Sequence, residues 1–146
     1  MYFYLPIIIF LLLDQGIKIL VRTTMTEGQS IPVISGIFHI TYIENPGAAF
    51  GMLANQRLLF ILITAVMLCI LIYVYLHLPN RKSAASVSLA LIVSGAIGNF
   101  IDRFLYGTVT DFLDFQIWPI FNIADICICC GVALLCYLLI FKGDSF

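Results

Sequence analysis

Charged residues are scarce in this chain of 146 residues: only 10% are Asp, Glu, Lys or Arg, whereas 62% are hydrophobic. Soluble domains average about 25% charged residues, so this composition excludes an ordinary soluble domain and predicts a membrane protein. An excess of positive charge is also lacking, because seven Lys and Arg stand against eight Asp and Glu. Proteins that bind nucleic acid need a basic surface, so we expect no nucleic-acid partner.

Linkers, repeats and metal motifs are missing as well. No Pro/Ser-rich stretch and no repeat of fixed period divides the sequence, which predicts a single domain over residues 1–146. The chain has no HExxH motif, and its cysteines do not form the two CxxC pairs of a zinc site, so we expect no metal site. The cysteines lie inside apolar segments and are expected to be small, buried packing residues: Cys69, Cys127, Cys129, Cys130 and Cys136.

Long apolar runs are what the sequence does contain. A transmembrane helix needs about 20 mostly apolar residues, and four stretches satisfy this, at residues 3–22, 58–78, 84–104 and 121–141. The first run carries Asp14 and Lys18 and has no small-x-small cleavage site, which predicts a retained helix rather than a cleaved signal peptide. The expected fold class is therefore an all-α membrane protein with four transmembrane helices.

Residues 23–57, between the first and second helices, are too polar to cross a membrane. Short runs of β-branched and aromatic residues, as in "IPVISGIFHITYIEN", predict a small sheet that rests on the outer membrane surface. Arg81 and Lys82 in the loop between the second and third helices, with Lys142 near the C-terminus, favour a cytoplasmic position for that loop and for both termini.

Ionisable side chains inside a span are costly, and they usually mark a functional site. Asp14 and Lys18 are four residues apart, which predicts a neutralising pair on one helix face. The order of the helices then places the unusual polar groups in one layer near the outer leaflet. The other members of that layer are Asn99, Asp102, Arg103, Asn122 and Asp125.

Such a layer suits acid–base chemistry by two carboxyl groups. Two carboxylates held close together share one proton, so that one can activate water while the other donates to a carbonyl. We predict that Asp111 and Asp125 form this pair, with Asp114 as the rival for the first place, and we otherwise interpret Asp114 as a solvated interfacial carboxylate. His39 in the expected sheet and His77 at the far end of the second helix provide no evident Ser/His or Cys/His pair.

Other residues are expected to support the pair. Asn99 and Arg103 are interpreted as groups that orient a carboxylate, because Asn has no proton to exchange and Arg stays protonated. The run "SGAIG" at 94–98 is typical of a small-residue face for close helix packing.

Five motifs, in this order, resemble the lipoprotein signal peptidase family, also called signal peptidase II. They are "DQGIK" at 14–18, "NPGAAFG" at 45–51, "GNFIDR" at 98–103, "VTDF" at 109–112 and "FNIAD" at 121–125. The resemblance implies an aspartyl endopeptidase of the bacterial cytoplasmic membrane in which Asp111 and Asp125 are the catalytic dyad. It implies supporting roles for Asp14, Lys18, Asn45, Asn99, Arg103 and Asn122.

The resemblance also implies a reaction. Members of this family remove the signal peptide of a diacylglyceryl-modified prolipoprotein and cut immediately before the lipidated cysteine, without a metal or cofactor. Globomycin-type cyclic peptides inhibit them. We therefore expect a substrate that enters sideways from membrane lipid, into a cleft near the outer leaflet that the "NPGAAFG" segment helps to shape.

Two other classes of protein fit parts of the sequence. A four-helix thiol oxidoreductase that works with a quinone would use the cysteines of the fourth helix, although adjacent helical positions face different directions. A proton or ion carrier would use intramembrane carboxylates, although these cluster on one side instead of forming a relay across the bilayer. A noncatalytic scaffold would leave Asp111 and Asp125 unexplained.

Overall fold

The computed structural model of the chain describes residues 1–47 and 53–142. Within these residues there are four long helices, α1 (Tyr4–Thr24), α2 (Arg57–Leu76), α3 (Ala84–Leu105) and α4 (Ile123–Phe141). Each is long and apolar enough to cross a membrane, so the four expected spans are confirmed. Their ends differ from the expected ends by at most two residues.

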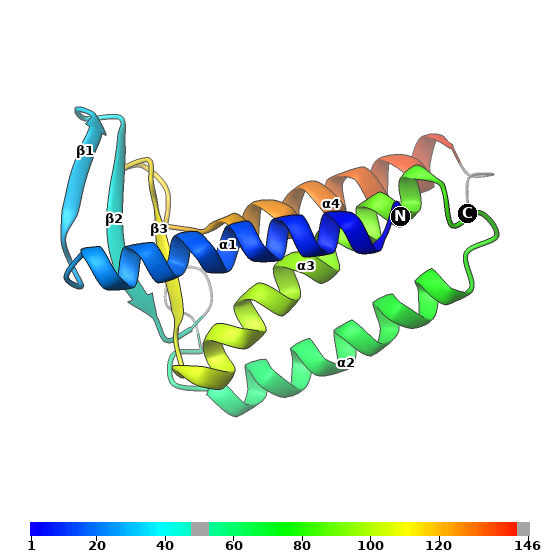
Figure 1. Cartoon of the computed structure of the whole chain (residues 1–146), viewed down its shortest axis with the longest axis horizontal. Helices are drawn as coiled ribbons and strands as arrows, with labels where there is room; N and C mark the ends of the chain where they lie inside the picture. The colour runs from blue at the N-terminus through cyan, green and yellow to red at the C-terminus, as the bar shows by residue number, and fades with distance from the viewer. Residues whose placement is uncertain (48–52, 143–146) are drawn as a thin grey trace.

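Helix α3 is the central helix of the bundle. It runs obliquely between α2 on one side and α1 and α4 on the other (Figure 1). It carries twelve buried residues, against two to four on each of the other helices. Small residues such as Ala85, Ala90 and Gly95 make up much of its buried surface, which allows the neighbouring backbones to approach closely.

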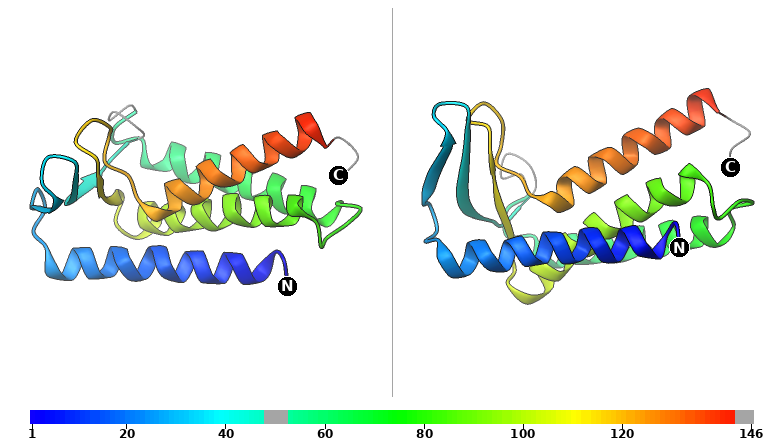
Figure 2. Two further views of the ribbon diagram at one scale, coloured as in Figure 1. Left: turned by 90° about the horizontal axis from the view of Figure 1, so that it is seen from above. Right: turned by 45° about the horizontal axis from the view of Figure 1, so that its top comes forward.

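Three antiparallel strands cross one end of the bundle, in the order β1 (Ser30–Ile34), β2 (Phe38–Asn45) and β3 (Val109–Asp114) (Figures 1 and 2). The hairpin of β1 and β2 confirms the expected sheet, to which residues outside 23–57 add a third strand. The third strand comes from the connection between α3 and α4. It pairs with β2, which would otherwise present a row of unpaired backbone groups at its outer edge.

The two ends of the bundle differ in character. The start of α1, the end of α4 and the loop between α2 and α3 lie at the end away from the sheet (Figure 1). The other end holds the sheet, the C-terminal ends of α1 and α3 and the N-terminal end of α4. This arrangement brings the polar residues of three helices and one strand to the same end of the molecule.

Gly95 lies where α3 and α4 approach closely, as the small-residue run predicted. A Cβ atom at this position would overlap the carbonyl oxygen of Ala124 and lie 2.8 Å from Cγ1 of Ile128. We expect Gly95→Ala to lower the free energy of unfolding by about 1–3 kcal/mol, because the two backbones would have to separate. Thermal unfolding in detergent measures this loss.

Gly16→Ala is the matched control for this substitution. Nothing lies within 4 Å of a Cβ atom built at Gly16, and Ala has a higher helix propensity than Gly. The control is therefore expected to keep or slightly raise the melting temperature. A Gly95→Ala protein that melted at the same temperature as the control would contradict the close packing.

Candidate active site

Asp111 lies in β3 opposite Ile43 of β2, with only 2% of its surface exposed. Its Oδ2 accepts a hydrogen bond from Asn45 Nδ2 at 3.0 Å, and its Oδ1 accepts one from Asn122 Nδ2 at 2.6 Å. Burial raises the pKa of Asp111 to about 7, and the charge of Asp125 adds to the rise. The hydrogen bonds from the two asparagines act in the opposite direction on this pKa. Asp111 is therefore a carboxyl group that can hold a proton near neutral pH.

Asp125 lies in the first turn of α4, where it forms a capping box with Asn122. The backbone N–H of Asn122 donates to Oδ2 of Asp125 at 3.2 Å, and the backbone N–H of Asp125 donates to Oδ1 of Asn122 at 2.9 Å. The other carboxylate oxygen accepts a hydrogen bond from Asn99 Nδ2 at 2.8 Å. The start of a helix carries a partial positive charge, which stabilises a carboxylate at this position.

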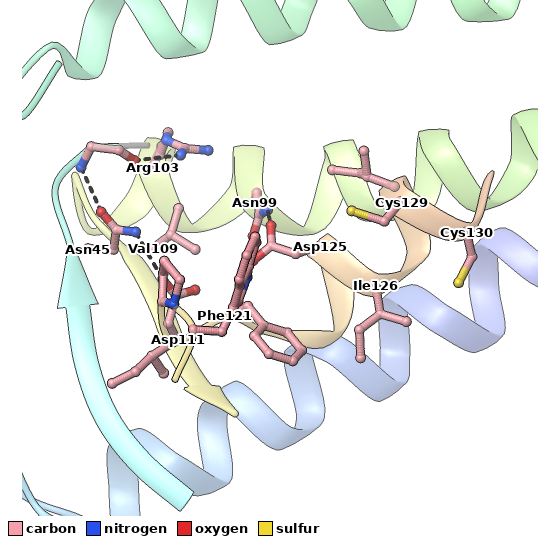
Figure 3. Close-up of a pocket in the computed structure, with 15 residues that line it drawn as sticks. Asn45, Asn99, Arg103, Val109, Asp111, Phe121, Asp125, Ile126, Cys129 and Cys130 are labelled. Carbon is pink, nitrogen blue, oxygen red and sulfur yellow. Dashed lines mark hydrogen bonds between the residues drawn. The ribbon is translucent and has the colours of Figure 1, made fainter. Parts of the chain in front are cut away.

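Two asparagines connect Asp111 with Asp125. Asn122 Nδ2, which donates to Asp111, also lies 3.2 Å from Oδ1 of Asn99. Asn99 in turn donates to Asp125 (Figure 3). The structure thus brings the two predicted aspartates and two of the predicted supporting residues into one hydrogen-bonded group.

Lys18 forms the centre of a buried ion cluster next to this group. Its Nζ lies 2.9 Å from Oδ2 of Asp14 and 2.9 Å from Oδ2 of Asp102, and it donates to Oδ1 of Asn99 at 3.0 Å. These three acceptors match the three protons of an ammonium group. The expected contact between Asp14 and Lys18 is confirmed.

Lys18 also fixes the orientation of the Asn99 amide. An ammonium group has no acceptor, so Asn99 must turn its oxygen towards Lys18 and its NH₂ group towards Asp125. The ion cluster therefore determines which atom of Asn99 the Asp125 carboxylate meets.

Asn45 and Arg103 border the site at the β2 end. The Oδ1 of Asn45 accepts the backbone N–H of Gly47 at 3.0 Å, which leaves its NH₂ group facing Asp111. Arg103 donates to the carbonyl oxygen of Gly47 at 3.1 Å (Figure 3). Both contacts hold the start of the "NPGAAFG" motif; its remaining residues, 48–51, lie outside the described residues.

Four further polar residues near the pair had no predicted role. Asp102 binds Lys18 and also Arg22, whose Nη2 lies 2.9 Å from Oδ1 of Asp102. Arg22 Nε donates to Thr110 Oγ1 at 2.7 Å, and Thr110 Oγ1 donates to Glu44 at 2.9 Å. Helical spacing could have linked Arg22 to Lys18, which lies four residues before it. The contact of Thr110 with Glu44 depends on strand pairing, for which the sequence carries no comparable signal.

A cavity of about 610 Å³ lies beside the carboxyl pair. Its polar lining includes Asp111 and Asp125, and its apolar lining comes from the segment before α4 and from α4 itself (Figure 3). A cavity of this kind can hold a peptide bond against the carboxyl groups and an apolar group alongside. The lining residues are Asn45, Gly47, Asn99, Arg103, Val109, Asp111, Trp118, Pro119, Ile120, Phe121, Asp125, Ile126, Ile128, Cys129 and Cys130.

Asp114 does not belong to this group. Only 7% of its surface is exposed, and it accepts a hydrogen bond from Thr41 Oγ1 at 2.7 Å. The interpretation of Asp114 as a solvated carboxylate is therefore wrong. Pairing of β3 with β2 buries the side chain at the far end of the strand from Asp102.

The cysteines also differ from expectation. All five are free, and only Cys127 is buried. Burial was wrong for the other four because the exposed surface of a span faces acyl chains, where a small apolar side chain is well accommodated. Among residues 1–47 and 53–142, no group of three or more His, Cys, Asp or Glu side chains could hold a metal ion.

Residues 6–141 match the family model described as signal peptidase (SPase) II. A lipoprotein signal peptidase of Moorella thermoacetica is 45% identical over 143 residues, which cover 98% of this chain and 95% of the relative. A lipoprotein signal peptidase of Caldanaerobacter subterraneus subsp. tengcongensis is 50% identical over 132 residues, which cover 90% of each protein.

Two solved structures share the fold, and both are described as bacterial membrane enzymes studied by the in meso method. One, at 2.3 Å resolution, is 37% identical with a TM-score of 0.89 and covers 97% of this chain and 88% of its own. The other, at 1.9 Å, is 38% identical with a TM-score of 0.86 and covers 94% of this chain and 91% of its own. Agreement along nearly the whole length, in both sequence and fold, shows that this multi-pass membrane protein belongs to the signal peptidase II family.

Proposed function

We propose that the chain is an aspartyl endopeptidase that removes the signal peptide from diacylglyceryl-modified prolipoproteins and cuts immediately before the lipidated cysteine. The observation that carries the proposal is the pair Asp111 and Asp125, joined through asparagines at the wall of one cavity. The names of the relatives, lipoprotein signal peptidases, support the choice of substrate.

The pair can carry out peptide hydrolysis with one shared proton. The ionised carboxylate takes a proton from water, and the resulting hydroxide attacks the carbonyl carbon of the scissile bond while the protonated carboxyl group donates to its oxygen. When the tetrahedral intermediate collapses, the C–N bond breaks, and the carboxyl group that took the water proton donates it to the leaving amine nitrogen of the cysteine. The other carboxylate takes back a proton from a hydroxyl of the intermediate, so the pair again holds one proton, and the signal peptide leaves with a carboxylic acid that ionises in water.

Asn45, Asn99 and Asn122 position the carboxyl groups in this scheme, and Asp14 and Lys18 act through Asn99. Arg103 contributes positive charge close to the pair and holds Gly47 at the cavity. Each of these groups donates to or braces a reacting group and none needs to exchange a proton.

The position of the site also suits a substrate held in a membrane. The cavity lies at the sheet end of the bundle, and apolar residues of α4 continue away from the carboxyl pair (Figure 3). We propose that the chain lies in the bacterial cytoplasmic membrane with this end towards the outer leaflet and with Arg81 and Lys82 in the cytoplasm. Membrane lipid then delivers the diacylglyceryl group to the level of the scissile bond.

The test is cleavage of a diacylglyceryl-modified prolipoprotein by the purified protein in detergent. We expect one cut before the lipidated cysteine, identified by mass spectrometry, inhibition by globomycin and no cleavage of the same prolipoprotein without its lipid. A protein that cleaves neither substrate contradicts the proposal.

Replacing all five cysteines by Ala or Ser is expected to leave turnover in place, which separates this function from thiol chemistry.

A dependence on pH follows from the raised pKa of Asp111. Asp111 holds its proton below about pH 7 and loses it above, so the pair loses its shared proton as pH rises, and kcat/KM should fall along an alkaline limb near pH 7. The apparent pKa of this limb belongs to the coupled pair of carboxyl groups and not to one residue. Asn45→Ala removes a donor that stabilises ionised Asp111, so its pKa rises further and the limb moves to higher pH. The loss of this positioning contact also lowers the maximal rate.

The pH profile of kcat/KM, measured for wild type and Asn45→Ala with the lipidated substrate, checks this expectation. Asn80→Ala is a suitable control, because Asn80 is an exposed asparagine that also holds a turn, through a bond from the Lys82 N–H at 2.9 Å. Its profile should match wild type. An alkaline limb that stays in place or moves to lower pH in Asn45→Ala would contradict the role given to Asn45.

A further inference from the structure

Asp114 is a buried carboxylate that the proposed reaction does not use. Its Oδ1 accepts the backbone N–H of Gln116 at 2.8 Å, and its Oδ2 accepts Gln116 Nε2 at 2.6 Å and Thr41 Oγ1 at 2.7 Å. Three donors therefore converge on one carboxylate at the end of β3. Gln116 has a φ of 64°, a left-handed backbone conformation that costs energy for a residue with a side chain, and the two bonds to Asp114 hold it there.

The segment that Asp114 holds forms part of the cavity wall. We call residues Phe115–Phe121 the rim segment. It is closed at its base by the Phe121 N–H, which donates to Leu113 O at 3.1 Å, and by the Leu113 N–H, which donates to Phe121 O at 2.8 Å. Four of its residues line the cavity: Trp118, Pro119, Ile120 and Phe121. Ile117 and Trp118 are also exposed, at 93% and 65%.

A chain of hydrogen bonds joins the same carboxylate to the β1–β2 hairpin. Thr41 Oγ1 lies 2.7 Å from Ser30 Oγ, which lies 3.0 Å from Nδ1 of His39. The carboxylate can only accept, so the Thr41 proton points to Asp114 and the Ser30 proton points to Thr41. Ser30 can then only accept from His39, so Nδ1 of His39 carries a proton. Every donor in this chain points towards Asp114.

We propose that Asp114 is a positioning residue for substrate binding: it locks the rim segment against the cavity and anchors it to the hairpin through Thr41, Ser30 and His39. The inference rests on the proposed function, since it names the part of the protein that shapes the substrate site. Asp114 acts through the rim segment and does not touch the reacting bond. Its loss should therefore weaken binding and leave the chemical step intact.

The test compares KM and kcat of Asp114→Asn with those of wild type, on the lipidated prolipoprotein and with the full chain in detergent. We expect KM to rise at least about tenfold, because charge-assisted bonds to the rim segment are lost, while kcat stays close to wild type. Gln116→Ala, which removes one bond and keeps Asp114, should raise KM less. Thr41→Val should also raise KM less, because it breaks only the anchor to the hairpin.

The tautomer of His39 provides a readout that a general loss of stability would not move. In Asp114→Asn, the amide oxygen of the new side chain must accept from the Gln116 backbone N–H, because a backbone N–H can only donate. The NH₂ group of that side chain therefore faces Thr41. The chain then either reverses, so that the His39 proton moves from Nδ1 to Nε2, or loses its bond between Ser30 and His39, because Nε2 is buried without a hydrogen-bond partner among the described residues. ¹⁵N NMR of His39 detects both changes. Thr23→Val is the matched control for Thr41→Val, because exposed Thr23 bonds only to carbonyls of its own helix, and it should change neither KM nor the tautomer.

The outcomes separate this inference from the proposed function. A wild-type protein that fails to cleave the lipidated substrate removes the proposed function. A wild-type protein that cleaves it, with Asp114→Asn and Gln116→Ala at wild-type KM, overturns the inference alone. A fall in kcat at unchanged KM also overturns it, because Asp114 would then act on the chemical step. If Asp114→Asn does not fold, Gln116→Ala and Thr41→Val decide the question by the same constants.

Discussion

Replacing Asp111 or Asp125 by Asn is expected to lower kcat by about 10⁴-fold, the scale of losing an acid–base group that acts as part of a unit. Asn has nearly the same shape as Asp and keeps one of the two accepting oxygens at each position, so the fold should persist. It cannot take a proton from water or share one with its neighbour. Single-turnover and steady-state cleavage of the lipidated prolipoprotein measures the loss.

Folding and specificity controls accompany these two variants. Each should elute as wild type on size exclusion and melt within a few degrees of it, and EDTA should leave wild-type turnover unchanged. Asp114→Asn is the matched Asp-to-Asn change outside the pair, and we expect it to retain kcat while its KM rises. Turnover that survived in both Asp111→Asn and Asp125→Asn would contradict the aspartyl mechanism. The thiol oxidoreductase and ion-carrier hypotheses would then be the leading alternatives.

Lys18→Met is expected to lower the free energy of unfolding by about 3–5 kcal/mol, the usual cost of leaving a buried charge without its partner. In the native cluster Lys18 pairs with Asp14 and Asp102, and Lys18 and Asp102 are completely buried. Arg22 pairs with Asp102 and also lies 3.9 Å from Glu44. Methionine has a similar length but no charge, so Asp14 would lose its ion-pair partner and Asp102 would keep Arg22 alone. Denaturant or thermal unfolding in detergent micelles measures this loss of stability.

The double variant Lys18→Met/Asp14→Asn distinguishes charge imbalance from lost packing. It removes one negative charge together with the charge of Lys18, so the net charge of the cluster equals that of wild type, and Asn at position 14 can still accept the Ala124 N–H that Asp14 Oδ1 accepts at 2.9 Å. We expect it to be more stable than Lys18→Met. Lys82→Met, in the exposed loop between α2 and α3, is the control and should change stability by less than about 0.5 kcal/mol. A double variant no more stable than the single one would show that charge balance is not the cause.

The long apolar runs were sufficient to predict the helices. Length and hydropathy decide whether a segment crosses a bilayer, because its backbone groups must bond within the segment whatever lies beside it. The contact of Asp14 with Lys18 was predictable for the same local reason, since residues four apart lie on one face of a helix. The order of the spans also indicated that their polar residues would gather at one end.

Strand β3 and the contacts that depend on it were not predictable in this way. Asp111 was chosen for its residue type and position, but its burial, its raised pKa and its bond to Asn45 follow from the pairing of β3 with β2. Asp114 lies in the same strand and its predicted environment was wrong for the same reason. Strand pairing between residues more than sixty positions apart leaves no mark in the spacing of either segment.

The sequence by itself determined the four spans, the presence of a small sheet after the first, and the small set of polar residues that a membrane span would not otherwise tolerate. Those properties depend on the energy of single segments in lipid. The tertiary structure alone decided which polar atoms meet: that Lys18 turns the Asn99 amide towards Asp125, that Asn122 caps α4 while bonding Asp111, and that Asp114 holds the rim of the cavity. Hydrogen bonds act over about 3 Å, so these partners are fixed only when helices and strands distant in sequence pack against one another.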